Sequence, residues 1–182
     1  MPTVRNALQR LIDDTLALSE SGYLSCHQDP DWPSPCEVGA PGQWRPVAQS
    51  SPLNFDGLAN AAEAPIHPDV IEFYQSFWGG HLQANAEEGP LSLIQLWNND
   101  DFDHLIENLV GHLFMKNQSK APFTIFFANT DPDTDFFLSV HNESGVVLLE
   151  EPGKPPHREV AQNLSLFLSR LKATEQPVTN DL

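Results

Sequence analysis

The segment from Pro90 to Met115 constrains the fold most, because it combines a short apolar run with an amphipathic helical pattern. The run LSLIQLW, from Leu91 to Trp97, follows a Gly-Pro turn and has the length and borders of a buried strand. Asn98 and Asn99 are favourable N-cap residues, and three aspartates follow where the positive end of a helix dipole favours carboxylates. The sequence therefore predicts a strand that leads directly into a helix.

One face of this predicted helix is apolar. Its members recur at the i, i+3, i+4, i+7 spacing that places side chains on one stripe facing a core: Phe102, Leu105, Ile106, Leu109, Val110, Leu113 and Phe114. Gly111 lies inside the helix, where glycine costs about 1 kcal/mol relative to alanine. We therefore expect another element to pass too close to Gly111 for a Cβ atom.

The rest of the chain predicts short strands joined by tight turns, with helices before and after them. Alternating apolar residues between Gly-, Pro- or Asp-rich turns are typical of hairpins, and apolar residues three to four apart are typical of helices on a core. In chain order we expect a helix over 4–19, a loop-rich segment over 23–64 with short strands near 36–38 and 43–47, a helix over 67–78, a hairpin formed by 81–88 and 91–97, strands over 123–129, 135–142 and 146–151, and a helix over 160–171.

These elements predict an α+β fold, in which helices pack on an antiparallel-rich mixed β-sheet. At 182 residues with 40% hydrophobic content, the chain can bury one sizeable core, so we expect a single domain over residues 1–172. Trp32, Trp44 and Phe55 are expected to anchor the long loop to that core. Residues 173–182 contain Pro177 and no apolar period, which predicts a flexible tail.

The charge of the chain is strongly negative and unevenly distributed. Nine basic and 25 acidic residues give a formal net charge of -16, and no Lys or Arg occurs between Pro46 and Met115. Such a field repels nucleic acid and anionic membrane surfaces, and it attracts a basic protein partner. The alternative interpretation is that the acidic surface only keeps the protein soluble.

Six carboxylates are the candidate contacts to such a partner. Asp100 and Asp101 are the leading candidates for contact with the partner, because we expect them on the outer face of the helix start. The full set of candidate partner-binding residues is Glu37, Glu87, Glu88, Asp100, Asp101 and Asp103.

Sites of other kinds are not indicated by the spacing of chemically active residues. Cys26 and Cys36 lie too far apart for a zinc pair, and His104 and His112 are eight residues apart rather than the four of a helical zinc site. Nucleophile and phosphate-loop motifs are missing. We therefore expect no catalytic residue, metal, cofactor or small-molecule substrate. Two cysteines imply no disulfide framework, so we expect a reduced cytosolic setting. No apolar run approaches the ~18 residues of a membrane span.

Several motifs in the chain resemble those of one family. They are Trp32 with Ser34-Pro35-Cys36, Gln43-Trp44 with Pro46, His67 with Phe73-Tyr74, Gln95-Leu96-Trp97 with Asp100-Asp101-Phe102, Glu107 to Leu113, and Asn163 to Lys172. In this order they resemble the SecY-interacting protein Syd family, whose fold is similar to the SUKH type. Leu96 replaces the Thr of the family pattern.

The resemblance implies a small cytoplasmic protein that is not an enzyme. It would hold basic cytoplasmic loops of the SecY translocon in an acidic groove and so associate peripherally with the cytoplasmic side of the inner membrane, with a role in monitoring SecY assembly. Membrane association would then come only from the protein partner. The alternative is an immunity-type protein that neutralises a basic toxin nuclease, as some SUKH-type proteins do.

Overall fold

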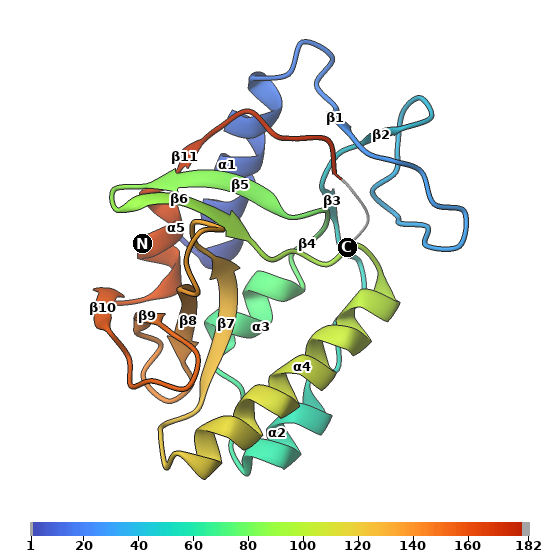
Figure 1. Cartoon of the computed structure of the whole chain (residues 1–182). Coiled ribbons are helices and arrows are strands. Elements are labelled where there is room, and N and C mark those ends of the chain that lie inside the picture. The colour runs from blue at the N-terminus through green and yellow to red at the C-terminus, as the bar shows by residue number, and fades with distance from the viewer. Residues whose placement is uncertain (1, 180–182) are drawn as a thin grey trace.

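The computed structural model describes residues 2–179 (Figure 1). Its elements are α1 (Val4–Ala17), β1 (Leu24–Ser25), β2 (Gln43–Trp44), β3 (Val47–Ala48), α2 (Asp56–Ala62), α3 (Pro68–Tyr74), β4 (Phe77–Trp78), β5 (Leu82–Ala86), β6 (Gly89–Leu93), α4 (Asn99–Gln118), β7 (Thr124–Asn129), β8 (Phe137–His141), β9 (Val147–Glu150), β10 (Arg158–Ala161), α5 (Leu164–Ser169) and β11 (Lys172–Ala173).

A curled seven-stranded sheet forms the centre of the fold. Its strand order is β10-β9-β8-β7-β6-β5-β11, and all neighbouring strands are antiparallel. The predicted hairpin is present, with Leu82 opposite Leu93 and Ala86 opposite Gly89. The three strands expected after the long helix are also present as β7, β8 and β9. The α+β fold class is therefore confirmed.

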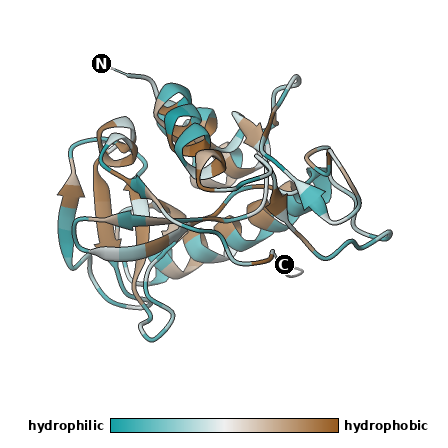
Figure 2. Ribbon diagram, turned by 90° about the horizontal axis from the view of Figure 1, so that it is seen from above, coloured by the Kyte–Doolittle hydropathy of each residue, from teal (hydrophilic) through white to brown (hydrophobic). Residues whose placement is uncertain are grey.

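The main core lies on one face of this sheet, beneath α1, α3 and α5, which contact one another. Phe127 on β7 contacts Phe73 of α3 and Phe167 of α5, with ring centroids 5.7 Å apart in both pairs. Figure 2 shows hydrophobic positions along the strands and hydrophilic ones concentrated in the loops and outer helix turns. The alternation of strand side chains leaves the second face of the sheet to form the site described below.

The long helix α4 begins where the sequence predicts. The Asn98 side chain accepts a hydrogen bond from the Asp101 N–H (2.9 Å), and Asp101 Oδ2 accepts one from the Trp97 N–H (2.8 Å). These bonds satisfy donors at the helix start and its entry, so the predicted N-cap is confirmed. The buried face of α4 consists of Phe102, Leu105, Leu109, Leu113 and Lys116.

Three predictions about α4 are wrong. Val110 is 39% exposed and Phe114 is 61% exposed, whereas Lys116 is buried in their place. The reason is that the C-terminal half of α4 turns Lys116 toward a carboxylate on the sheet. Apart from its chain neighbours and the backbone of its own helix, Gly111 has no atom within 4 Å of where a Cβ would lie, so no other element passes close to it.

The helix predicted over 67–78 ends at Tyr74. His67 forms its N-cap by accepting from the Asp69 N–H (3.2 Å). The chain then turns, and β4 pairs with β3. The buried Gln49 amide donates to the carbonyl oxygens of Tyr74 (2.9 Å) and Phe77 (3.0 Å), which satisfies acceptors at the early helix end.

The loop-rich segment is anchored by aromatic residues, as predicted. Trp44 is fully buried against Trp97, and Phe55 packs on Phe102 with centroids 5.1 Å apart. Strand pairing near 43–47 is present, but no strand forms at 36–38, so that prediction is wrong. The sequence analysis also missed α2, a seven-residue helix with one buried side chain, and β10, which follows a Pro-rich loop.

The expected flexible tail is paired with the domain as far as residue 179. Strand β11 pairs with the sheet edge at β5, and the Gln176 amide exchanges two 2.8 Å hydrogen bonds with the Gln83 backbone. The Thr179 N–H donates to the Ser25 carbonyl (2.8 Å). The tail thus supplies the hydrogen bonds that an exposed sheet edge would lack. Residues 180–182 lie outside the described residues.

Candidate functional site

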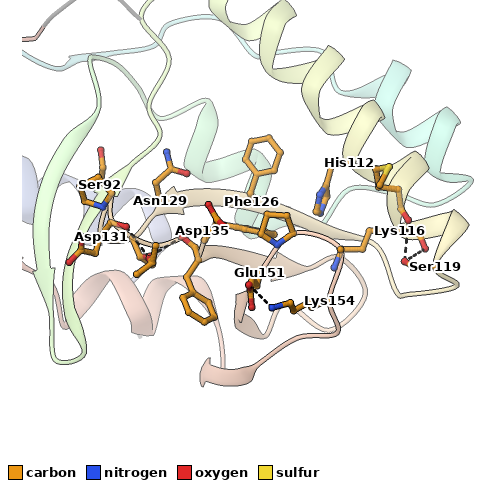
Figure 3. Close-up of a pocket in the computed structure, with 18 of the residues that line it drawn as sticks. Ser92, His112, Lys116, Ser119, Phe126, Asn129, Asp131, Asp135, Glu151 and Lys154 are labelled. Atoms are coloured by element: carbon orange, nitrogen blue, oxygen red, sulfur yellow. Dashed lines mark hydrogen bonds and ion pairs between the residues drawn. The ribbon is translucent and has the colours of Figure 1, made fainter.

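A groove of about 940 Å³ lies on the second face of the sheet, between the strands and the C-terminal half of α4. Figure 3 shows side chains from both elements and from two loops, 130–136 and 151–154, turned toward this space. The residues that matter below are Gln83, Ser92, Phe126 and Phe137 from the strands, His112, Met115 and Lys116 from α4, and Asp131, Asp135, Glu151 and Lys154 from the loops.

Strand alternation explains why these side chains reach the groove. Successive strand residues point to opposite faces, so Ile125 and Phe127 enter the core while Phe126 between them lines the groove. Leu91 and Leu93 are likewise buried on either side of Ser92. Gln83 and Ser92 are directly paired in register, and their side chains form a 3.0 Å hydrogen bond.

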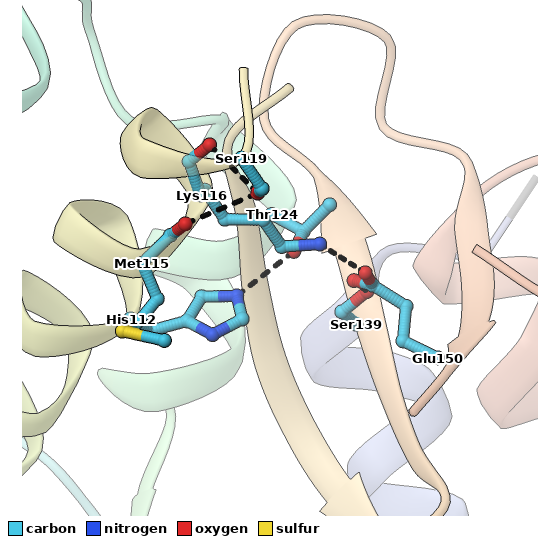
Figure 4. A network of polar contacts seen from close by, with 7 residues as sticks. All are labelled: His112, Met115, Lys116, Ser119, Thr124, Ser139 and Glu150. Carbon is cyan, nitrogen blue, oxygen red and sulfur yellow. Dashed lines mark hydrogen bonds and ion pairs between the residues drawn. The ribbon is translucent and has the colours of Figure 1, made fainter. Parts of the chain in front are cut away.

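A buried polar network closes the groove at the end of α4 (Figure 4). Lys116 Nζ forms an ion pair with Glu150 Oε2, and Ser139 Oγ donates to the other carboxylate oxygen. Burial raises the pKa of Glu150, but the hydrogen bonds from Lys116, Ser139 and Thr124 outweigh it, and the net pKa lies below its ordinary value. Glu150 is therefore a carboxylate at neutral pH.

His112 forms a wall of the groove beside this network. Its Nε2 lies 3.0 Å from Thr124 Oγ1, and its ring meets Phe126 and Phe137 edge to face. Burial, followed by the neighbouring Lys116 charge, lowers the pKa of His112 below 6.5. The imidazole is consequently neutral at pH 7, and this part of the groove is aromatic rather than cationic.

The rim of the groove carries carboxylates. Asp131, Asp133 and Asp135 lie in the exposed loop between β7 and β8, and none of the ion pairs within residues 2–179 includes them. One oxygen of Asp131 accepts from the Asp133 N–H (2.9 Å), which shapes the loop. The two lysines that line the groove are already paired, Lys116 with Glu150 and Lys154 with Glu151.

The six predicted site residues fall into two groups that the structure separates. Glu87 and Glu88 occupy the β5–β6 turn, and Glu88 lines, together with Asp131, a smaller hollow of about 240 Å³ beside the groove. Arg158 in the same hollow is 3.5 Å from Glu88. Glu88 therefore lines the hollow beside the groove, and Glu87 precedes it in the same turn without lining either space.

The other four residues lie around the start of α4, on the opposite side of the view in Figure 1. Asp100 and Asp103 are exposed, whereas Asp101 is partly buried in the helix cap. Glu37 accepts a hydrogen bond from the Ser34 N–H (2.9 Å), and the Ser34 hydroxyl donates to the Trp97 carbonyl. The carboxylates of Glu37 and Asp101 thus form hydrogen bonds with backbone N–H groups. Within residues 2–179, the side chains of Asp100 and Asp103 form no hydrogen bond or ion pair.

The sequence analysis missed the loop carboxylates of the groove. It treated TDPDT, residues 130–134, as a turn and Asp135 as the first residue of the next strand, although three of the six residues from 130 to 135 are aspartates. That density of charge was the available signal. The outward position of Phe126 and Phe137 could be anticipated only with the strand register, which the continuous apolar runs FTIFF and DFFL leave open.

Within residues 2–179, no group of three or more His, Cys, Asp or Glu side chains is placed to hold a metal ion. None of the helices in that range is long and apolar enough to cross a membrane. Burial raises the pKa of the Cys36 thiol to about 12, so Cys36 stays protonated at neutral pH.

Comparison with known proteins identifies relatives over almost the whole chain. The family model described as Syd protein (SUKH-2) matches residues 5–173. Protein Syd of Pseudoalteromonas atlantica is 40% identical over 163 residues, which cover 86% of this chain and 86% of the relative. Protein Syd of Colwellia psychrerythraea is 35% identical over 85% of this chain and 84% of the relative. For Protein Syd of Alteromonas mediterranea the identity is 34%, over 93% of this chain and 96% of the relative.

Proposed function

The chain belongs to the Syd protein (SUKH-2) family, and we propose that it is a non-enzymatic adaptor that binds basic cytoplasmic loops of the SecY translocon. It thereby associates with the cytoplasmic face of the inner membrane and monitors SecY assembly. The resemblance of its motifs to the SecY-interacting family supports this partner. The net charge of -16 supports a basic surface as the target.

One observation carries the choice of binding surface. Both lysines that line the groove are neutralised by the protein's own carboxylates, whereas Asp131 and Asp135 of the lining, and Asp133 between them in the same exposed loop, belong to no ion pair within residues 2–179. A basic loop entering the groove would meet these carboxylates without displacing an existing ion pair. Carboxylates on a hollowed surface also act on a cation together, which a flat surface does not allow to the same degree.

The cluster at the start of α4 is the competing surface. Asp100, Asp103 and Glu37 also give a negative field, and they are part of the predicted site. They surround an exposed helix start rather than a groove, so we place them second. Glu88 joins the first surface because it lines the hollow beside the groove together with Asp131, and Glu87 precedes it in the same turn.

Matched charge reversals distinguish the two surfaces. In one variant Asp133→Lys and Asp135→Lys change the groove rim and spare Asp131, whose side chain shapes the loop. In the other, Asp100→Lys and Asp103→Lys change the helix start and spare the capping Asp101. Each variant changes the net charge by the same amount.

Capture by proteoliposomes that contain purified SecY translocon is then measured for both variants. We expect the groove variant to lose capture and the helix-start variant to retain most of it. The reverse result would move the binding surface to the start of α4. Unchanged capture by both folded variants would contradict recognition by acidic residues altogether.

A further inference from the structure

The centre of the groove is apolar, in contrast to its rim. Phe126 and Phe137 each meet the His112 ring edge to face, with ring centroids 5.7 and 5.8 Å from it. Met115 projects from α4 into the same space and is 56% exposed, although its side chain is apolar. An unbranched thioether adapts its shape to whatever it contacts.

Among the described residues, the side chains around this apolar centre carry no free charge, unlike those at the rim. The Lys116 ammonium is directed to the buried Glu150, and His112 is neutral because burial lowers its pKa. A Lys or Arg side chain placed here would lose water without gaining a carboxylate, which is costly. A large aliphatic or aromatic side chain would instead bury its surface against Phe126, Phe137 and Met115.

We propose that the groove selects a peptide segment in which one large apolar side chain is flanked by Lys or Arg residues. The apolar side chain anchors between Met115 of α4 and the two phenylalanines of the sheet, and the basic residues contact Asp131 and Asp135 at the rim. This inference rests on the proposed function, because it specifies which basic segment the acidic groove accepts.

Two synthetic peptides test the anchor. One is acetyl-Lys-Arg-Gly-Leu-Gly-Arg-Lys-amide, and the other has Ala in place of the central Leu. They carry the same charge, so a purely electrostatic groove binds them equally. With an apolar anchor, we expect the Leu peptide to bind about tenfold more tightly, because an open groove buries only part of its three additional methylene-sized groups, whose full burial would give about sixtyfold. Titration calorimetry at low salt measures both affinities.

Two protein variants locate the anchor. Met115→Glu adds a negative charge inside the groove, whereas Phe114→Glu adds the same charge on the neighbouring exposed position, which does not line the groove. Charge alone predicts tighter binding of both basic peptides by Met115→Glu. The anchor predicts that Met115→Glu removes most of the tenfold preference for Leu and that Phe114→Glu keeps it.

The outcomes separate this inference from the proposed function. If the wild-type protein bound both peptides with equal affinity, the anchor would be overturned. Acidic recognition would still stand if the variant Asp133→Lys with Asp135→Lys no longer bound either peptide. A Leu preference unchanged in Met115→Glu would also overturn it, because the anchor would then lie elsewhere. No binding of either peptide would overturn both the anchor and the acidic groove.

Discussion

Lys116 on α4 and Glu150 on β9 form a buried ion pair that connects the end of the long helix to the sheet. The Glu150 carboxylate also accepts from the Ser139 hydroxyl, so both of its oxygens have partners. Removing one member of such a pair leaves an uncompensated charge in the interior, which is far more costly than replacing both members. The contact therefore holds one wall of the groove in place.

Lys116→Met should lower the free energy of unfolding by about 3–5 kcal/mol, because Glu150 would stay buried without its cation. Urea unfolding at pH 7, followed by circular dichroism, measures the change. The control is the double variant Lys116→Met with Glu150→Met, which removes both charges. The double variant should lose clearly less free energy of unfolding than the single variant. Equal losses of free energy would show that the pairing itself contributes little to stability.

The pair also predicts a loss of stability in acid. The pKa of Glu150 in the folded protein lies below its ordinary value of 4.5. A group of this kind stabilises the fold above its unfolded pKa, and that contribution disappears as the pH falls through the folded pKa. Urea unfolding from pH 7 to pH 3 should show that the wild type exceeds Glu150→Gln in stability at pH 7 and that the difference shrinks below pH 4.5. A constant difference would contradict this role of Glu150.

Gly111→Ala should raise the free energy of unfolding by about 1 kcal/mol, because alanine has the higher helix propensity and its Cβ would meet no atom of another element within 4 Å. In a domain of this size that corresponds to a rise in Tm of about 2–4 °C. Differential scanning calorimetry measures it. Gly80→Ala is the contrasting substitution, since its Cβ would lie 3.1 Å from both Trp44 and Thr179, and its Tm should fall.

Lys154→Ala should strengthen binding of a basic ligand in the groove. Lys154 is exposed and forms a 2.6 Å ion pair with Glu151, so its removal adds a free carboxylate to the lining at little cost in stability. We expect binding of the Leu peptide to tighten about twofold to fivefold at low salt, with the gain decreasing at ~0.5 M salt, where the Debye length is about 4 Å. Lys172→Ala, which makes the same change of charge on β11 outside the groove, should have a smaller effect.

Membrane association should depend entirely on a protein partner. A chain with a net charge of -16 is repelled by anionic headgroups, and each basic residue of a peripheral protein contributes only ~1 kcal/mol of membrane attraction. In flotation with protein-free anionic liposomes at physiological salt, the protein should stay in the bottom fraction. Liposomes that contain the SecY translocon should carry it upward. Flotation with bare lipid would contradict the electrostatic basis of the proposed function.

The sequence by itself determined the features that depend on neighbouring residues. Asn98 was identifiable as an N-cap because the capping bond reaches only three residues, to the Asp101 N–H. The β5–β6 hairpin was identifiable because its turn and its alternating side chains are contiguous in the chain. The same holds for the three strands β7 to β9, and together these elements predicted the α+β class.

Only the tertiary structure decided which residues share a surface. Phe114 is exposed and Lys116 is buried because the partner of Lys116 lies 34 residues away on β9. Glu88 borders the same hollow as Asp131 rather than joining Asp100, because the strand pairing of β5, β6 and β7 brings their turns together. Contacts of this range depend on how the sheet closes and curls, and local charge or periodicity carries no information about that geometry.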